Sequence, residues 1–173
     1  AESIYIGLIT DTGSFKYSSV SSSTHLIASN LKEIGLNHVA IHNNIFDQNS
    51  VSKINLLGYA LQKIKLDSKT SLAYLVLSKE ELEKFNFQKG DSEGFVNYCL
   101  SIKGVKNAVF LREDKSLIKI SLRSKGDVKM NEFSQKYYGG GGHQNAAGAA
   151  VESNDIDIVT KTLIENFRSF CSV

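Results

Sequence analysis

The 173-residue chain carries 20 Lys and Arg residues against 18 Asp and Glu residues, a formal net charge of +2, and 42% of its residues are hydrophobic. This near balance of charge excludes a strongly basic nucleic-acid coat protein, and the apolar content excludes a disordered tail. One domain or two small ones are expected. No apolar run reaches the roughly 18 residues of a membrane-spanning helix, so we expect no membrane association.

The two cysteines, Cys99 and Cys171, stand far apart in the sequence and match no metal-binding or redox spacing. The first residues of the chain resemble neither a signal peptide nor a transit peptide. Structural disulfides belong mainly to oxidising compartments. We therefore expect two reduced cysteines in a cytoplasmic protein.

The N-terminal third opens with an apolar run at residues 3–10, which predicts a buried strand followed by a turn at Asp11. Apolar residues at helical spacing then predict three helices, over residues 21–33, 38–46 and 51–64. Serines at 21–23 offer caps for the first of these helices.

The rest of the chain alternates between strand and helix patterns, which predicts an α/β fold. We expect a junction near residues 67–69. Beyond it the patterns predict a strand at 71–77, helices at 79–85 and 91–102, a hairpin of 105–112 with 116–123, a helix at 130–137, a strand at 149–151 and an amphipathic helix at 155–170.

Asp11 is the first candidate catalytic residue because it directly follows the predicted strand at 3–10. Open α/β sheets place their active sites at the carboxyl ends of strands. An aspartate that bonds its own turn backbone is the alternative. Asp-Thr-Gly is also a local signature of aspartic proteases, but those all-β enzymes need a second aspartate or a symmetric dimer. The helical patterns of this chain disfavour that class.

Four consecutive glycines, residues 139–142, precede His143. Glycines lose more backbone entropy on folding than other residues, so such a run is not there for stability. Its amides can surround an anion, and His143 adds a donor that can carry charge near neutral pH. A flexible linker is the alternative. Linkers are usually Gly/Ser mixtures, whereas this run continues as His-Gln-Asn-Ala-Ala-Gly.

Arg123 ends a predicted strand of alternating character and is followed by Ser124, Lys125 and Gly126. A guanidinium group at a strand end can present two parallel donors to a phosphate or a carboxylate. Residues 112–136 carry an excess of positive charge and lie just ahead of the glycine run. Taken alone, the segment favours a solvated strand end with ordinary surface charges.

Together these segments resemble the DHH-family phosphoesterases, specifically the bacterial nano-RNase type with its DHH-associated C-terminal domain. Residues 7–17 (GLITDTGSFKY) are similar to the fourth motif of the catalytic domain. Residues 120–126 (ISLRSKG) and 139–148 (GGGGHQNAAG) are similar to the two binding motifs of the C-terminal domain. Residues 91–97 (DSEGFVN) are similar to a further family motif at a helix start.

The resemblance implies an α/β fold in which the end of a parallel-sheet DHH catalytic domain, residues 1–66, precedes a smaller α/β substrate-binding domain, residues 67–173. It implies that Asp11 is a catalytic manganese ligand of a two-metal centre. It also implies a set of residues that hold the substrate phosphate or ribose: Arg123, Ser124, Gly140, Gly141, Gly142 and His143.

The family's other metal-binding motifs, of the His-x-x-x-Asp-x-Asp and Asp-His-His types, do not occur in this chain. Most manganese ligands would therefore lie outside it, and we expect the chain to fold yet be inactive alone. The expected activity of the whole protein is hydrolysis of short oligoribonucleotides or related small nucleotides. A non-catalytic nucleic-acid-binding module and a polyphosphate or pyrophosphate hydrolase are the alternatives, and a homodimer stays open.

Overall fold

The structure, a computed structural model, describes residues 1–172. It contains two compact units, unit 1 over Ala1–Ser50 and unit 2 from Val51 onward. Unit 2 holds a six-stranded sheet with helices, which confirms the mixed α/β class. No helix within residues 1–172 is long and apolar enough to cross a membrane.

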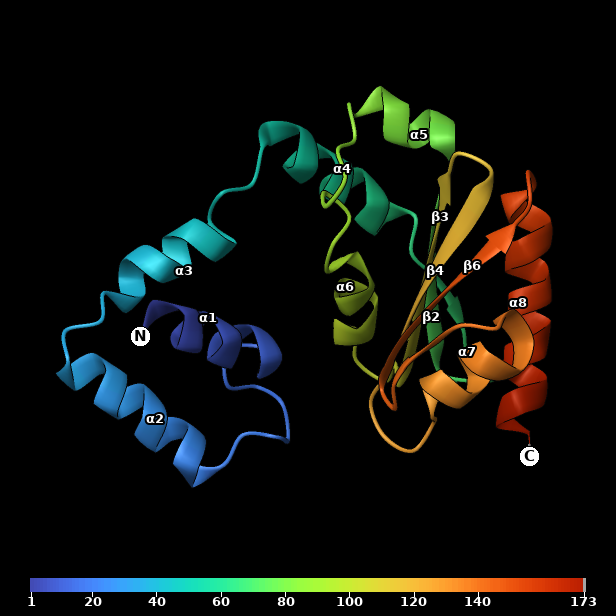
Figure 1. Ribbon diagram of the computed structural model, residues 1–173. Helices are drawn as coiled ribbons and strands as arrows, with labels where there is room; N and C mark the ends of the chain where they lie inside the picture. The colour runs from blue at the N-terminus through green and yellow to red at the C-terminus, as the bar shows by residue number, and fades with distance from the viewer. Residues whose placement is uncertain (173) are drawn as a thin grey trace. The chain divides into compact units, whose positions relative to one another are not determined.

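Unit 1 consists of helices α1 (Glu2–Asp11), α2 (Ser22–Glu33) and α3 (His38–Phe46), shown in blue to cyan in Figure 1. The predicted helices at 21–33 and 38–46 are confirmed. Ser21 caps α2, and its side chain accepts a hydrogen bond from the Thr24 amide. A small core joins the three helices and contains Tyr5, Ile9, Leu31, Leu36 and Ile41.

The predicted strand at residues 3–10 is wrong, because this segment forms α1. A short continuous apolar run fits a buried strand and a helix equally well, and the spacing of buried residues decides between them. Tyr5 and Ile9 are buried four positions apart, whereas Ile4 and Ile6 are exposed. Unit 1 contains no strand in its described residues, and a helix satisfies its own backbone hydrogen bonds without one.

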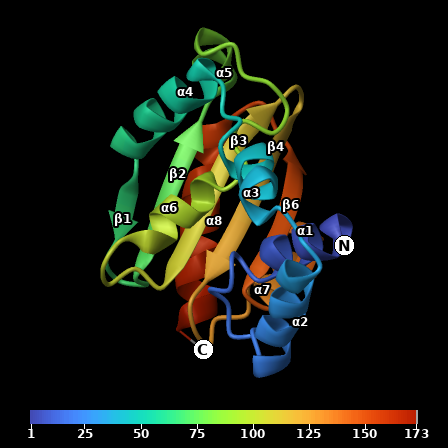
Figure 2. The ribbon, with the colours of Figure 1, turned by 90° about the vertical axis from the view of Figure 1, so that its left-hand side faces the viewer.

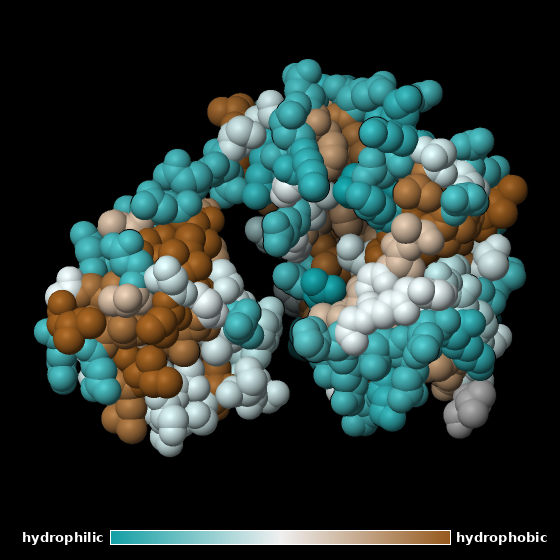
Figure 3. Space-filling model, in the orientation of Figure 1, coloured by the Kyte–Doolittle hydropathy of each residue, from teal (hydrophilic) through white to brown (hydrophobic). Residues whose placement is uncertain are grey.

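Apolar side chains cover much of the surface of unit 1, seen as brown areas over these helices in Figure 3. Large hydrophobic residues at least one-third exposed include Ile4, Ile6, Leu26, Ile27, Ile34, Val39 and Phe46. The three-helix core therefore buries only part of the apolar surface of this unit.

The sheet of unit 2 has the strand order β1-β2-β3-β4-β6-β5. The strands are β1 (Lys65–Asp67), β2 (Leu72–Leu77), β3 (Asn107–Asp114), β4 (Leu117–Ser124), β5 (Gly141–His143) and β6 (Ala146–Glu152). Only β2 and β3 are parallel, and the other neighbouring pairs of this sheet are antiparallel. The predicted hairpin is confirmed as β3 and β4.

One face of the sheet is covered by α7 (Met130–Tyr138) and α8 (Ile156–Cys171), as Figure 1 shows. Its core includes Ile118, Ile120 and Leu122 of β4, packed with Phe133 and Phe167 of the helices. We call this the helix-covered face. Because β4 alternates between half-buried and buried residues, its other side chains point to the opposite face.

The opposite face is covered only in part. Helices α4 (Val51–Gln62), α5 (Lys79–Lys84) and α6 (Phe95–Ser101) pack there, and Figure 2 shows α4 and α6 in front of β2 and β3. α6 reaches β4. Beyond it, the residues of β6 and β5 that point to this side are half-buried or exposed. We call this part of the sheet, together with the half-buried residues Lys119, Ser121 and Arg123 of β4 that point to the same side, the open face.

Unit 2 begins at Val51, ahead of the boundary at residue 67 that the resemblance implies. The reason is packing: Leu56 and Ala60 of α4 are fully buried in the same core as Leu75 and Phe95. The three-residue strand β1 was not predicted. Assignment of the N-terminal residues to a DHH catalytic domain stays a prediction.

Candidate functional site

Arg123 is a half-buried residue near the end of β4, on the open face. Its Nη1 donates a 2.9 Å hydrogen bond to the carbonyl of Leu122. The other two arginines form ion pairs with carboxylates. Arg112 Nη2 lies 3.5 Å from Asp114 Oδ2, and Arg168 Nη2 lies 2.7 Å from Asp67 Oδ1. Arg123 has no carboxylate partner among residues 1–172. Its remaining donors are available to a ligand.

Arg123 and His143 lie in one row across three strands. Arg123 of β4 pairs with Ala146 of β6, and Ala146 pairs on its other side with His143 of β5. Directly paired residues of antiparallel strands point to the same face. Two strand spacings put the Cα atoms of Arg123 and His143 roughly 10 Å apart. The small Ala146 side chain between them leaves space for an anion.

The glycine run leads from α7 into β5. Gly139 ends α7 with a φ of +62°, which is a left-handed conformation typical of a glycine at this position. A Cβ at Gly140 would lie 2.3 Å from the Gly148 carbonyl oxygen, and a Cβ at Gly142 would lie 2.5 Å from the Ala146 carbonyl oxygen. Close backbone packing therefore explains these two glycines.

The amides of the glycine run differ in availability. The Gly140 amide donates to the Ser134 carbonyl at 3.2 Å, so it is not free to bind an anion. Gly141 and His143 lie in β5, which forms the edge of the sheet. An edge strand keeps a row of unpaired backbone groups. The amides of β5 that point away from β6 are therefore the better candidates for an anion.

Ser124 points away from Arg123, to the helix-covered face. It is buried, its hydroxyl donates to the Val128 carbonyl at 2.7 Å, and it accepts from Asn145 Nδ2 at 2.9 Å. Asn145 also donates to the Gly126 carbonyl. Ser124 thus connects the loop after β4 to the turn between β5 and β6, and its hydroxyl is occupied.

Asp11 is the last residue of α1 and is exposed. It belongs to unit 1, whereas Arg123 and His143 belong to unit 2. Residues 1–172 contain no group of three or more His, Cys, Asp or Glu side chains that could hold a metal ion. Because a hard divalent ion takes roughly six ligands, the residues present do not fit a two-manganese centre.

The shifted pKa values in unit 2 belong to structural contacts. The hydrogen bond from Arg168 lowers the pKa of Asp67, and Thr70 Oγ1 adds a second donor at 2.7 Å. Hydrogen bonding to Lys119 lowers the pKa of Asp114. Burial raises the pKa of the Cys99 thiol to about 11.

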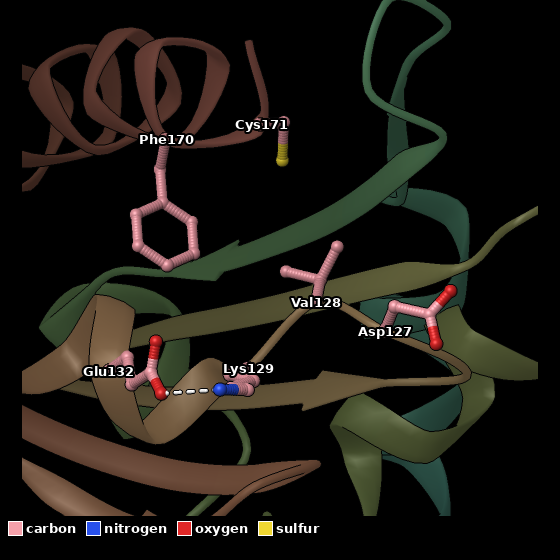
Figure 4. Close-up of a pocket in the computed structure, with 6 residues that line it drawn as sticks. All are labelled: Asp127, Val128, Lys129, Glu132, Phe170 and Cys171. Carbon is pink, nitrogen blue, oxygen red and sulfur yellow. Dashed lines mark hydrogen bonds and ion pairs between the residues drawn. The ribbon is translucent and has the colours of Figure 1, made fainter. Parts of the chain in front are cut away.

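A pocket between the start of α7 and the end of α8 is the cavity shown in Figure 4. Its lining is Asp127, Val128, Lys129, Glu132, Phe170 and Cys171. Lys129 and Glu132 form an ion pair, with Lys129 Nζ 2.8 Å from Glu132 Oε1. None of these is a predicted site residue, and α7 and α8 lie on the helix-covered face, whereas Arg123 lies on the open face.

Sequence reasoning missed the neighbours of Arg123 on the open face. Ser121 lies two residues before it on β4 and pairs with Gly148, which pairs with Gly141 of β5. Lys119 follows in the next row and binds Asp114. The period-2 alternation of β4 was the signal that could have found Ser121.

The amino-acid sequence of this chain is similar to those of a known domain family and of named bacterial proteins. Residues 69–169 match the family model described as the DHHA1 domain. The chain is 31% identical over 155 residues to the bifunctional oligoribonuclease and PAP phosphatase NrnA of Bacillus subtilis, covering 90% of the chain and 48% of that protein. It is 30% identical over 170 residues to the probable enzyme of that name from Streptococcus mutans, covering 95% and 54%.

Among solved structures, an exopolyphosphatase-related protein from Bacteroides fragilis is similar, with a TM-score of 0.91 and 38% identity. The match covers 99% of this chain and 51% of that one. The chain therefore spans about half the length of the relatives it matches.

Proposed function

Because the chain belongs to the DHHA1 domain family, we propose that unit 2 is the substrate-binding part of a metal-dependent phosphoesterase. The proposed substrates are short oligoribonucleotides or related small nucleotides. The names of the Bacillus subtilis and Streptococcus mutans relatives support this class of substrate.

The observation that carries the proposal is the row Arg123–Ala146–His143 on the open face. Arg123 supplies a guanidinium group without a carboxylate partner in the described residues, and His143 supplies an exposed imidazole. Charge-assisted hydrogen bonds to phosphate are stronger than neutral ones. We assign the terminal phosphate of the substrate to this row, with the outward amides of β5 beside it.

Asp11 is assigned a separate task, as one ligand of a manganese centre whose other ligands lie outside these residues. A single carboxylate cannot hold two such ions. In such a centre the metal would activate water and stabilise the charge on the phosphate. The residues of this chain bind and orient the substrate, and Arg123 and His143 fix its phosphate on the sheet.

The proposal is tested on a full-length protein that joins these residues to the family's remaining metal-binding motifs. We expect manganese-dependent hydrolysis of a two-nucleotide RNA. Asp11→Asn should abolish turnover without weakening nucleotide binding, whereas Arg123→Ala should mainly raise KM. Lys161→Ala, at an exposed position of α8, is the matched control. Binding of RNA without any hydrolysis by the full-length protein would favour the non-catalytic module.

Hydrolysis of inorganic polyphosphate is a second candidate, supported by the name of the Bacteroides fragilis relative. The row of Arg123 and His143 would fit a terminal phosphate of either substrate. The same assay with polyphosphate in place of RNA separates the two candidates. Faster turnover of polyphosphate than of the two-nucleotide RNA would favour the second.

A further inference from the structure

Two lysines extend the open face beyond the end of β4. The Lys125 amide donates a 2.7 Å hydrogen bond to the Lys106 carbonyl, which continues the pairing of β3 and β4 past their last paired residues. Lys106 and Lys125 therefore stand opposite each other, two positions beyond the row of Arg123. We call these two lysines the lysine edge.

The lysine edge faces the same side of the sheet as Arg123. Residues two positions apart along a strand point to the same face, and Lys125 follows Arg123 by two positions. The Lys125 ammonium also donates a hydrogen bond to the Leu100 carbonyl of α6, a helix that packs on the side of the sheet opposite to α7 and α8. Two residues along a strand separate the row of Arg123 from the lysine edge by about 6.7 Å.

The positive charge of the lysine edge is not neutralised by the described part of the chain. Lys106 and Lys125 are exposed, and neither forms an ion pair with a carboxylate among residues 1–172. The carboxylate nearest to Lys125 in the sequence, Asp127, lines the pocket between α7 and α8. Lys103, in the loop between α6 and β3, adds a further exposed charge. An anion beside Arg123 would therefore meet an excess of positive charge.

The Lys106 ammonium is available to such an anion. A cation near the end of a helix interacts favourably with its C-terminal carbonyls, and this structural role accounts for Lys125 beside Leu100. The backbone of Lys106 takes part in hydrogen bonds, since its amide donates to the Ser71 carbonyl at 3.0 Å. Its ammonium has no hydrogen-bond or ion-pair partner within residues 1–172. Lys125 also keeps two of the three donors of its ammonium.

We propose that the lysine edge binds the second phosphate of the substrate, the phosphodiester next to the terminal phosphate. The inference rests on the proposed function, because the terminal phosphate must occupy the row of Arg123 and His143. The separation of about 6.7 Å between that row and the lysine edge is comparable to the distance between successive phosphates of an extended nucleic acid strand. A lysine ammonium acts as a compact point charge, which suits the single negative charge of a phosphodiester. The lysine edge therefore favours a dinucleotide over a mononucleotide.

The test compares two ligands in calorimetric titrations of the 173-residue chain. Adenosine monophosphate has a terminal phosphate alone, whereas a 5′-phosphorylated diadenylate has a terminal phosphate and a phosphodiester. The wild type should bind the diadenylate more tightly. Lys106→Ala and Lys125→Ala should each weaken diadenylate binding by about fivefold, the size of an exposed charge pair, while binding of adenosine monophosphate should not change. Added salt should reduce the preference for the diadenylate, because exposed charges are screened.

Further variants separate the effect of charge from that of folding. Lys106→Arg keeps the positive charge and should retain the affinity for the diadenylate. Lys161→Ala removes the same charge from an exposed position of α8 and should change neither affinity. If Lys125→Ala proves unstable because it loses the hydrogen bond to Leu100, Lys106→Ala carries the test, since the Lys106 ammonium has no partner to lose within residues 1–172.

Unchanged affinity for the diadenylate in both lysine variants would overturn the role of the lysine edge. Equal losses for the two ligands, or equal affinity of the wild type for them, would overturn it as well. Each of these results would leave the proposed function intact, provided that Arg123→Ala weakens binding of both ligands. A wild-type chain that binds neither ligand would instead contradict the proposed function.

Discussion

Arg168 of α8 and Asp67 of β1 form a two-point ion pair across 101 positions of sequence, with Nη2 2.7 Å from Oδ1 and Nε 3.3 Å from Oδ2. Asp67 is only 8% exposed. The pair joins the first strand of the sheet to the last helix of unit 2. It therefore holds α8 against β1, an edge strand of the sheet that carries the open face.

Replacing Arg168 by alanine should lower the free energy of unfolding of unit 2 by about 1–3 kcal/mol, since a buried carboxylate loses its charged donor. Thr70 would remain as a donor to Asp67. Chemical denaturation measures the loss, and Arg168→Lys should restore only part of it, because an ammonium cannot form the two-point contact.

The same pair predicts a pH dependence. The folded pKa of Asp67 is lowered, first by the hydrogen bond from Arg168. A carboxyl group whose pKa is lower in the folded state stabilises the fold at a pH above its unfolded pKa of about 3.9. This stabilisation is lost as the pH falls through the folded pKa. The difference in stability between wild type and Arg168→Ala should thus be constant near neutral pH and shrink below about pH 4. A difference that grows on acidification would contradict this assignment.

Helix α4 should be essential to unit 2. Leu56 is fully buried against the sheet, and the Tyr59 hydroxyl donates to Glu81 of α5 at 2.5 Å. A chain of residues 51–173 should unfold cooperatively, whereas a chain of residues 67–173 should not, because it lacks this part of the core. Leu56→Ala should cost about 2–5 kcal/mol, against little change for the exposed Leu26→Ala. If the chains of residues 51–173 and 67–173 were equally stable, α4 would not be a structural part of unit 2.

Ser124 should matter for folding and not for binding. Its buried hydroxyl donates to Val128 and accepts from Asn145. Ser124→Ala should lower the free energy of unfolding by about 1–2 kcal/mol while the affinity for adenosine monophosphate stays within twofold of wild type. A tenfold loss of affinity without a loss of stability would instead return Ser124 to the substrate-binding set that the family resemblance implies.

The two free cysteines should react at very different rates. Cys99 is fully buried and its thiol pKa is raised to about 11, whereas Cys171 is exposed. Because the thiolate is the reactive form, a thiol reagent at pH 8 should modify Cys171 in the folded chain and reach Cys99 only on unfolding. Mass spectrometry of the labelled peptides checks the order.

Sequence patterns predicted most elements of unit 2, because alternation in β4 and helical spacing in α8 are long and regular. They failed where the signal is short or ambiguous. The continuous apolar run of α1 has no distinguishing period, and β1 has only three residues. Strand β5 was not foreseen because glycines are disfavoured in strands and normally indicate a loop.

The candidate site followed a similar division. Residue types identified Arg123 and His143, but only the pairing of β4, β6 and β5 shows that they share one row. Hydrogen-bond partners could not be read from the sequence, so the occupied Gly140 amide and Ser124 hydroxyl were not foreseen. The role of Asp11 depends on residues outside the chain and stays a prediction.

The most direct test of the shared anion site is a double-mutant cycle, measured by calorimetric titration with adenosine monophosphate. The wild type is compared with Arg123→Ala, His143→Ala and the double variant, and Lys161→Ala serves as the control. Each single change should weaken binding by about tenfold or more, since a charged contact contributes roughly 1.5–3 kcal/mol. The double variant should lose less than the sum of the two, because both residues hold one phosphate. Titration curves of the single variants that superimpose on the wild-type curve would contradict the account.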